Sequence, residues 1–240
     1  MPAAATRSRA TWAWGSESVI PVTWTPWRLA AWMAKAPQPQ PTSSTRSPAC
    51  RPSLEHTSSS LASCASSSVV AAGMADRVEI RVADYRELGR EERYDAIASI
   101  GMVEHVGDEQ IDAYAEVLAS RLERGGRLLN HGIARLTPGP TNAGPFSERY
   151  VFPDGDPLPL SRVQLALELA GFETLHIEGL REDYSETLRH WAERLDANLA
   201  EGERLAGAER LRVWRLYLRA ARNGFDTKHT SIYQVRCVKK

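Results

Sequence analysis

The sequence changes character near residue 73, and only the part that follows has the hydrophobic periodicity of a folded domain. Residues 37–68 are rich in Ser and Pro and have little periodicity, which is typical of a linker or a disordered segment. The first 75 residues hold two acidic residues against six basic ones. We therefore predict a poorly ordered segment over residues 1–72, either of low complexity or mistranslated through an upstream reading-frame error. Residues 73–240 are predicted to form the folded domain.

Strand-like and helix-like segments alternate in this second part. Val78, Ile80 and Val82 alternate with charged residues, which predicts a strand. The later segments with strand character are Tyr94–Ile100, a short apolar run expected to be buried, and then Arg127–Ile133, Thr174–Ile177 and Ser231–Val238. Apolar residues at helical spacing occupy residues 111–122 and 186–224 between them. The alternation predicts an α/β fold with a largely parallel sheet.

Several residues have the types and spacings found at helix ends. Asp108 precedes the helix whose apolar face begins at Ile111, so it is predicted to be the N-cap. Ser161 and Gln164 have the spacing of a capping box, and Gly171 stands where the following C-terminal cap is expected.

The composition argues against several classes of function. Lys plus Arg and Asp plus Glu both number 30, so the formal net charge is zero, which gives no electrostatic basis for binding nucleic acid. The sequence has no run of 18 apolar residues, which argues against a transmembrane segment. The three cysteines have neither metal-ligand spacing nor the pattern of a disulfide framework. We therefore expect no metal site and a cytoplasmic location.

Four residues stand where chemistry is expected, because a doubly wound sheet binds ligands at the carboxyl ends of its strands. Asp84 follows the first predicted strand, Glu104 follows the second, and His131 lies near the end of the third. Tyr184 lies in a polar loop that enters a long helix. Each residue has an ordinary alternative: a strand-end cap, a surface acid, a core histidine, or a tyrosine packed on the sheet edge. Their convergence on one end of one sheet favours a shared site.

Four motifs, in a fixed order, carry a resemblance to a known family. They are Ser99-Ile-Gly-Met-Val-Glu-His-Val-Gly107, Leu128-Leu-Asn-His-Gly-Ile133, Arg149-Tyr-Val-Phe-Pro-Asp-Gly155 with Leu158-Pro-Leu-Ser161, and Asp183-Tyr-Ser-Glu-Thr-Leu-Arg-His-Trp191. From about Gly73 to its C-terminus, the chain resembles the cyclopropane fatty acid synthase family, which includes the mycolic acid cyclopropane synthases.

The resemblance implies a fold and an activity. The fold is the Rossmann-like class I methyltransferase fold, with S-adenosyl-L-methionine as the cofactor. The activity is transfer of a methylene group to the cis double bond of a phospholipid acyl chain, a step of lipid biosynthesis that gives a cyclopropane fatty acid. Two family features are missing from this chain: a Gly-rich turn after the first strand, and an N-terminal helical segment with a Cys. The sheet is therefore expected to be incomplete on its N-terminal side, and the activity of this chain stays open.

The resemblance also assigns residues to the site. It implies a bound bicarbonate that serves as the base, and a small anion in an apolar tunnel needs hydrogen bonds. Its expected ligands are Glu104, His131, Ile133 and Tyr184, of which Glu104, His131 and Tyr184 are the expected catalytic residues. The expected contacts with S-adenosyl-L-methionine are Asp84, Tyr85 and Ile100.

The implied partners are phospholipid acyl chains, which places the protein at the inner membrane surface as a peripheral protein and leaves a homodimer open. The candidate apolar surface is Pro145–Phe152 with Pro157–Leu160; its alternative is a buried loop plug. Two other functions stay open. One is a lipid or small-molecule methyltransferase that stops before ring closure, and the other is a non-catalytic, truncated fragment.

Overall fold

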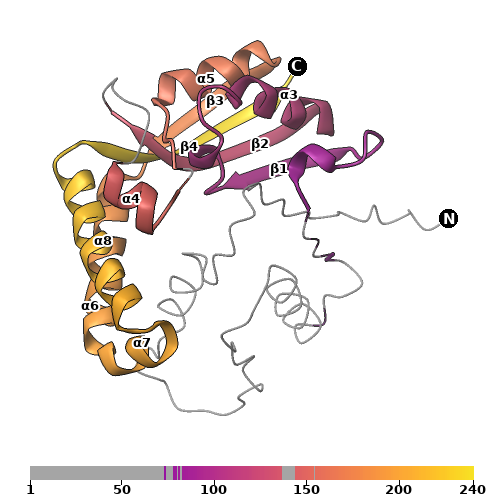
Figure 1. The fold of residues 1–240 in the computed structure, drawn as a ribbon. Helices are drawn as coiled ribbons and strands as arrows, with labels where there is room; N and C mark the ends of the chain where they lie inside the picture. The colour runs from indigo at the N-terminus through magenta and orange to yellow at the C-terminus, as the bar shows by residue number, and fades with distance from the viewer. Residues whose placement is uncertain (1–72, 74–77, 80, 82, 137–143, 154) are drawn as a thin grey trace. The chain divides into compact units, whose positions relative to one another are not determined.

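The computed structural model describes residues 73, 78–79, 81, 83–136, 144–153 and 155–240 (Figure 1). The chain divides into two compact units. The first contains Met1–Thr23 and Pro37–Tyr94, and the second contains Trp24–Ala36 and Asp95–Lys240; we describe each unit by itself. The low-complexity segment predicted over residues 1–72 lies outside the described residues, so it stays a prediction.

The described part of the first unit contains a short 3-10 helix in place of a strand. Helix η1 (Tyr85–Glu87) begins after Asp84. The strand predicted over residues 78–82 is wrong at its described positions, because Val78, Glu79 and Arg81 are not in a strand. Alternation alone does not form a strand, since the ladder needs hydrogen bonds from a neighbouring strand. Arg81 instead pairs with Glu92, at 2.5 Å between Nη2 and Oε2.

The second unit is built on a four-stranded sheet. Its strands are β1 (Tyr94–Ile100), β2 (Leu122–Arg135), β3 (Phe172–Gly179) and β4 (Thr230–Lys239), in the order β1-β2-β4-β3. The strands predicted in these four regions are therefore confirmed. Strand β4 runs antiparallel to both β2 and β3, which leaves those two parallel to each other. The expected largely parallel sheet is corrected at β4, because the last strand returns between two others.

Strand β1 is not the buried strand that its apolar sequence predicts. Ser99 is its one buried residue, and Ile100 is 43% exposed. The reason is its place at the end of the strand order, where it has a neighbour within the sheet on one side only. A buried hydrogen-bond cluster nevertheless fixes it: the Tyr114 hydroxyl lies 2.7 Å from Ser99 Oγ and 2.7 Å from Asn130 Oδ1 on β2.

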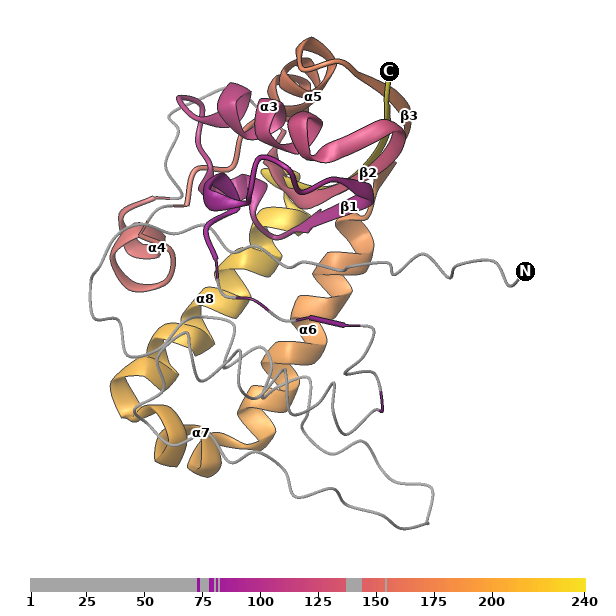
Figure 2. The same ribbon diagram turned by 90° about the vertical axis from the view of Figure 1, so that its right-hand side faces the viewer.

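The helices form two groups (Figures 1 and 2). Helices α3 (Ile111–Arg121) and α5 (Leu160–Leu169) pack together over one face of the sheet. Helices α6 (Arg181–Ala197) and α8 (Ala208–Asp226) lie side by side, joined through α7 (Leu199–Ala206). The short helix η2 (Val103–His105) follows β1. The short helix α4 (Pro145–Tyr150) precedes α5.

A hydrophobic core lies between α6 and α8. Its fully or almost fully buried members include Leu188, Leu195, Trp214, Leu218 and Phe225. The helical spacing over residues 186–224 predicts this apolar face correctly. Each such side chain contributes about 1.5–3 kcal/mol by its removal from water, so this core holds the helix pair together.

Two of the three predicted helix caps are wrong. Helix α3 begins after Gln110, and the Asp108 carboxylate instead accepts a hydrogen bond from Arg162 Nε at 2.6 Å. Helix α5 begins after Pro159 without a side-chain cap, and its Gln164 donates along the helix to Glu168. The partner of Asp108 is distant along the chain, whereas the partner of Gln164 lies one helical turn further on.

The prediction for Gly171 is confirmed. Gly171 follows Ala170, the C-cap of α5, and has a φ of +95°. Its N–H donates to the Glu168 carbonyl. Glycine tolerates this left-handed conformation better than any other residue.

Candidate active site

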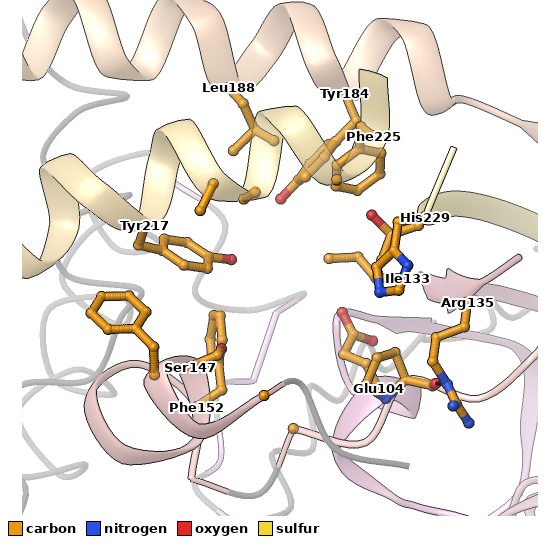
Figure 3. Close-up of a pocket in the computed structure, with 18 of the residues that line it drawn as sticks. Glu104, Ile133, Arg135, Ser147, Phe152, Tyr184, Leu188, Tyr217, Phe225 and His229 are labelled. Atoms are coloured by element: carbon orange, nitrogen blue, oxygen red, sulfur yellow. Dashed lines mark hydrogen bonds between the residues drawn. The ribbon is translucent and has the colours of Figure 1, made fainter. Parts of the chain in front are cut away.

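An apolar cavity of about 460 Å³ lies in the second unit, between the sheet and the pair α6 and α8 (Figure 3). Its walls come from η2, the end of β2, α4 and the segment after it, α6 and α8. The residues that matter for its chemistry are Glu104, Ile133, Phe146, Phe152, Tyr184, Trp191, Tyr217 and Phe225. The ionisable residues of this wall are Glu104, His105, Arg135, Tyr184, Tyr217 and His229, and the rest of the lining is mostly apolar.

Glu104 reaches the cavity because η2 follows β1 after a sharp turn. Gly101 has a φ of +65°, and its N–H donates to the His131 carbonyl at 2.9 Å, which ties the turn to β2. The backbone N–H of Asp156 donates to the Glu104 carbonyl at 2.8 Å. Figure 3 shows the Glu104 carboxylate pointing up into the cavity.

The buried Glu104 carboxylate accepts fewer hydrogen bonds than its two oxygens could. Burial raises its pKa, and hydrogen bonds from the backbone N–H groups of Glu104 and Ile133, together with the charge of His105, oppose this shift. Its Oε2 atom is buried without a hydrogen-bond partner within the described part of the chain. A buried acceptor without a partner is costly, so the arrangement suits a ligand that donates a hydrogen bond.

Tyr184 is carried by the first turns of α6, so the prediction that it lies in a loop is wrong. The helix begins at Arg181. Tyr184 therefore lies one helical turn before Leu188, on the same face of α6. The Tyr184 ring contacts Phe225 at 5.0 Å and Trp191 at 6.2 Å between centroids. Burial, and secondarily the charge of Glu104, raise the pKa of Tyr184 to about 12, so the phenol is a neutral donor.

The structure brings Glu104, Ile133 and Tyr184 to one cavity but does not place His131 in its wall. His131 is on β2, opposite Gln234 of β4. Alternation along the strand puts its side chain on the same face of the sheet as that of Ile133. Its Nδ1 is buried without a partner among the residues described, and burial lowers its pKa.

Of the residues expected to contact the cofactor, Asp84 and Tyr85 belong to the first unit and Ile100 to the second. The Asp84 carboxylate is engaged by Arg86, through the backbone N–H at 2.8 Å and the guanidinium Nε at 3.0 Å. Tyr85 is buried at 7% exposure in the same unit. Ile100 belongs to the second unit, at the exposed end of β1. The assignment of Asp84, Tyr85 and Ile100 to the cofactor therefore stays a prediction.

Sequence reasoning missed two residues of this site. Tyr217 lines the cavity from α8, in contact with Phe152 and Trp214 at ring distances of 5.6 and 5.3 Å. The sequence does mark this residue, because Tyr217 is a phenol next to Leu218 on the apolar face of a helix. Gly132 belongs to the motif that ends at Ile133, and its missing side chain makes room for η2.

The predicted apolar surface contributes to the cavity wall. Phe146 and Phe152 line the cavity and are partly buried, whereas Tyr150 is 39% exposed. Within the described residues, no helix is long and apolar enough to cross a membrane.

The fold and cavity define a class of protein. A mycolic acid cyclopropane synthase solved with SAH and CTAB superposes with a TM-score of 0.68 at 25% identity, over 74% of this chain and 66% of that one. A cyclopropane synthase from Mycobacterium tuberculosis gives a TM-score of 0.62 at 24% identity, over 68% of this chain and 60% of that one. The chain therefore has part of the Rossmann-like fold of class I S-adenosylmethionine-dependent methyltransferases.

The sequence comparisons narrow this class to a family. The family model for mycolic acid cyclopropane synthetase matches residues 56–235, and the chain belongs to this family. It is 37% identical to a probable fatty acid methyltransferase of Pseudomonas putida, over 71% of this chain and 44% of the relative. It is 31% identical to the cyclopropane-fatty-acyl-phospholipid synthase of Escherichia coli K12, over 66% of this chain and 40% of the relative. The chain thus spans about two fifths of the length of these curated relatives.

Proposed function

We propose that this protein is an S-adenosyl-L-methionine-dependent enzyme that transfers a methylene group to the cis double bond of a phospholipid acyl chain. The observation that carries the proposal is the apolar cavity with the Glu104 carboxylate and the Tyr184 hydroxyl directed into it (Figure 3). Family membership and the similarity to the cyclopropane-fatty-acyl-phospholipid synthase of Escherichia coli support it.

The cavity wall has the character that such a substrate needs. Aliphatic and aromatic side chains from α4, α6 and α8 surround a volume in which an acyl chain is removed from water. The rings of Tyr184, Trp191 and Phe225 present π faces that stabilise positive charge on the substrate. Exclusion of water by the same wall protects that charge from quenching.

S-adenosyl-L-methionine would supply an electrophilic methyl group, and the polar residues would control the proton that is then lost. We propose that Tyr184 donates a hydrogen bond to a bicarbonate ion, with His131 as a second donor. Glu104 would accept a hydrogen bond from the hydroxyl of that ion and so orient its basic oxygen. In the described geometry the Ile133 N–H serves Glu104 itself, which supports an indirect role for Ile133. We also propose a cytoplasmic location at the inner membrane surface; a homodimer would be compatible with it.

A second candidate is methyl transfer to a lipid without ring closure. Two relatives favour it, the probable fatty acid methyltransferases of Pseudomonas putida and of Mycobacterium tuberculosis, at 37% and 36% identity. Both reactions add the same mass to the acyl chain, so mass alone does not separate them.

The test is to incubate the purified chain with S-adenosyl-L-methionine and vesicles of a phospholipid with cis-unsaturated chains. Proton NMR of the recovered lipid shows upfield ring protons if a cyclopropane has formed, and a branched methyl or methylene group if ring closure has not occurred. Unmodified lipid, together with no binding of S-adenosyl-L-methionine by calorimetry, would instead support a non-catalytic fragment.

A further inference from the structure

Tyr217 occupies a position in the cavity that no family motif quoted above includes. It is carried by α8, and Figure 3 shows its hydroxyl directed into the same space as the Tyr184 hydroxyl and the Glu104 carboxylate. Edge-on contacts with Phe152, at 5.6 Å, and Trp214, at 5.3 Å, hold the ring from two sides. The direction of its hydroxyl is therefore set by packing.

Three of the polar groups that line this space, Glu104, Tyr184 and Tyr217, have hydrogen-bonding capacity that no group among the described residues uses. Glu104 Oε2 is buried and unpaired, and neither phenol has a hydrogen-bond partner among the residues that the structure describes. Buried polar groups are nearly always satisfied, and the exceptions ask for a bound ligand or water. Two donors and one acceptor around an apolar space fit a small oxyanion that carries a hydroxyl group.

The protonation states agree with this ligand. Burial, followed by the nearby Tyr184 and Glu104, raises the pKa of Tyr217 above its ordinary value. Both phenols therefore keep their protons at neutral pH, and each can donate to an anion. A hydrogen bond to a charged acceptor is stronger than one between neutral groups, and more so in a site that excludes water.

We propose that the Tyr217 hydroxyl is a second phenolic donor to the bicarbonate of this site, beside the Tyr184 hydroxyl. This inference rests on the proposed function and adds one residue to its anion site. It gives the anion two donors from two helices, so that its position is fixed relative to the acyl chain.

The experiment measures bicarbonate binding directly, with no cofactor or lipid present. ¹³C-labelled bicarbonate is titrated into the purified chain, and the dissociation constant is followed by ¹³C NMR for the unmutated chain and three variants. Tyr217→Phe and Tyr184→Phe each remove one donor, and each should bind about tenfold more weakly. Tyr150→Phe is the matched control, because it removes a phenol at a 39% exposed position outside the cavity, and it should bind as the unmutated chain does.

A second measurement does not depend on any variant folding. The Tyr217 ¹³Cζ resonance, assigned through its contacts with Phe152 and Trp214, should move when bicarbonate is added to the unmutated chain. A resonance that stays still, or Tyr217→Phe that binds bicarbonate normally while Tyr184→Phe binds weakly, would overturn the role of Tyr217 and leave the proposed function standing. If the unmutated chain binds no bicarbonate, the anion site itself fails, and with it this inference.

Discussion

Gly132 on β2 lies directly beneath Glu104. A Cβ atom added to Gly132 would come within 2.8 Å of Glu104 Oε2 and 2.2 Å of Val103 Cγ1. Real Cβ atoms do not approach neighbours this closely, so η2 can pack on β2 only while this position has no side chain. The position of the candidate catalytic carboxylate therefore depends on a glycine in the neighbouring strand.

We predict that Gly132→Ala destabilises the protein and moves Glu104. The added methyl group overpacks a closed contact, and such changes cost about 1–3 kcal/mol. Urea unfolding measures the loss in the free energy of unfolding. Adding Val103→Ala removes the Cγ1 atom that clashes, so the double variant should be less destabilised than the sum of the two single changes.

Gly179→Ala is the control for this prediction. It also adds a methyl group to a strand glycine, but its nearest neighbour would be a Tyr233 ring carbon at 3.3 Å, which can move slightly. It should cost clearly less than Gly132→Ala. Equal losses at the two positions, or strict additivity with Val103→Ala, would show that the contact with η2 is not the cause.

Tyr114→Phe should destabilise the sheet without affecting the cavity. The Tyr114 hydroxyl is buried between Ser99 and Asn130, and its removal deprives the Asn130 amide oxygen of its partner. Such a loss costs about 1–3 kcal/mol, measured as a lower midpoint in urea. Tyr150→Phe, at an exposed position, should stay within about 0.5 kcal/mol of the unmutated chain. A Tyr114→Phe midpoint equal to that control would mean that water replaces the hydroxyl.

The fold was largely predictable because its signals are local. Apolar periodicity located β2, β3, β4 and the face of α6 and α8, and Gly171 marked the end of α5 through its required backbone conformation. The wrong caps at Asp108 and Ser161 were not predictable in this way. Arg162, which engages the Asp108 carboxylate, is far from it along the chain, so spacing near the helix gives no sign of the pairing.

The site was predictable in part from strand order and in part from the resemblance. Glu104 and Tyr184 stand out by their places after a predicted strand and before a long helix, Ile133 only through the resemblance, and the structure gathers all three at one cavity. Tyr217 was missed because a tyrosine on an apolar helix face has the pattern of a core residue. Its role depends on where its hydroxyl points, which follows from the packing of α8 against Phe152 and not from helical periodicity.

Glu104→Gln should stabilise the protein at neutral pH. Burial raises the folded-state pKa of Glu104 above its ordinary value of 4.5, so the folded state holds this proton more tightly than the unfolded state does. Its contribution to the free energy of unfolding therefore falls as pH rises from about 4.5 through the folded pKa. Gln avoids the buried charge, and the melting temperature at pH 7 should rise by at least about 2 °C.

The pH dependence provides the check. Below pH 4.5 the carboxyl is protonated in both states, so the gain from Glu104→Gln should disappear there. Glu109→Gln, an exposed carboxyl near the same turn, is the control and should show no comparable gain. A gain from Glu104→Gln that is the same at all pH values would mean that packing, and not the buried charge, is responsible. In the proposed reaction this variant should lose activity, since it removes the charged acceptor.

Ala221→Leu should shorten the acyl chain that the cavity accepts. Ala221 lines the cavity from α8, one helical turn after Tyr217, so a larger side chain there occupies space that the ligand needs. Each buried methylene contributes about 0.8 kcal/mol. Exclusion of two of them should weaken the binding of oleic acid by about tenfold, while the shorter myristoleic acid loses much less. Displacement of a fluorescent fatty acid measures both affinities without requiring turnover.

Ala200→Leu, at an exposed position of α7 outside the cavity, should leave both affinities unchanged. An equal loss for the two fatty acids would mean that Ala221 does not border the end of the bound chain, and the assignment of this cavity to the acyl group would have to be revised.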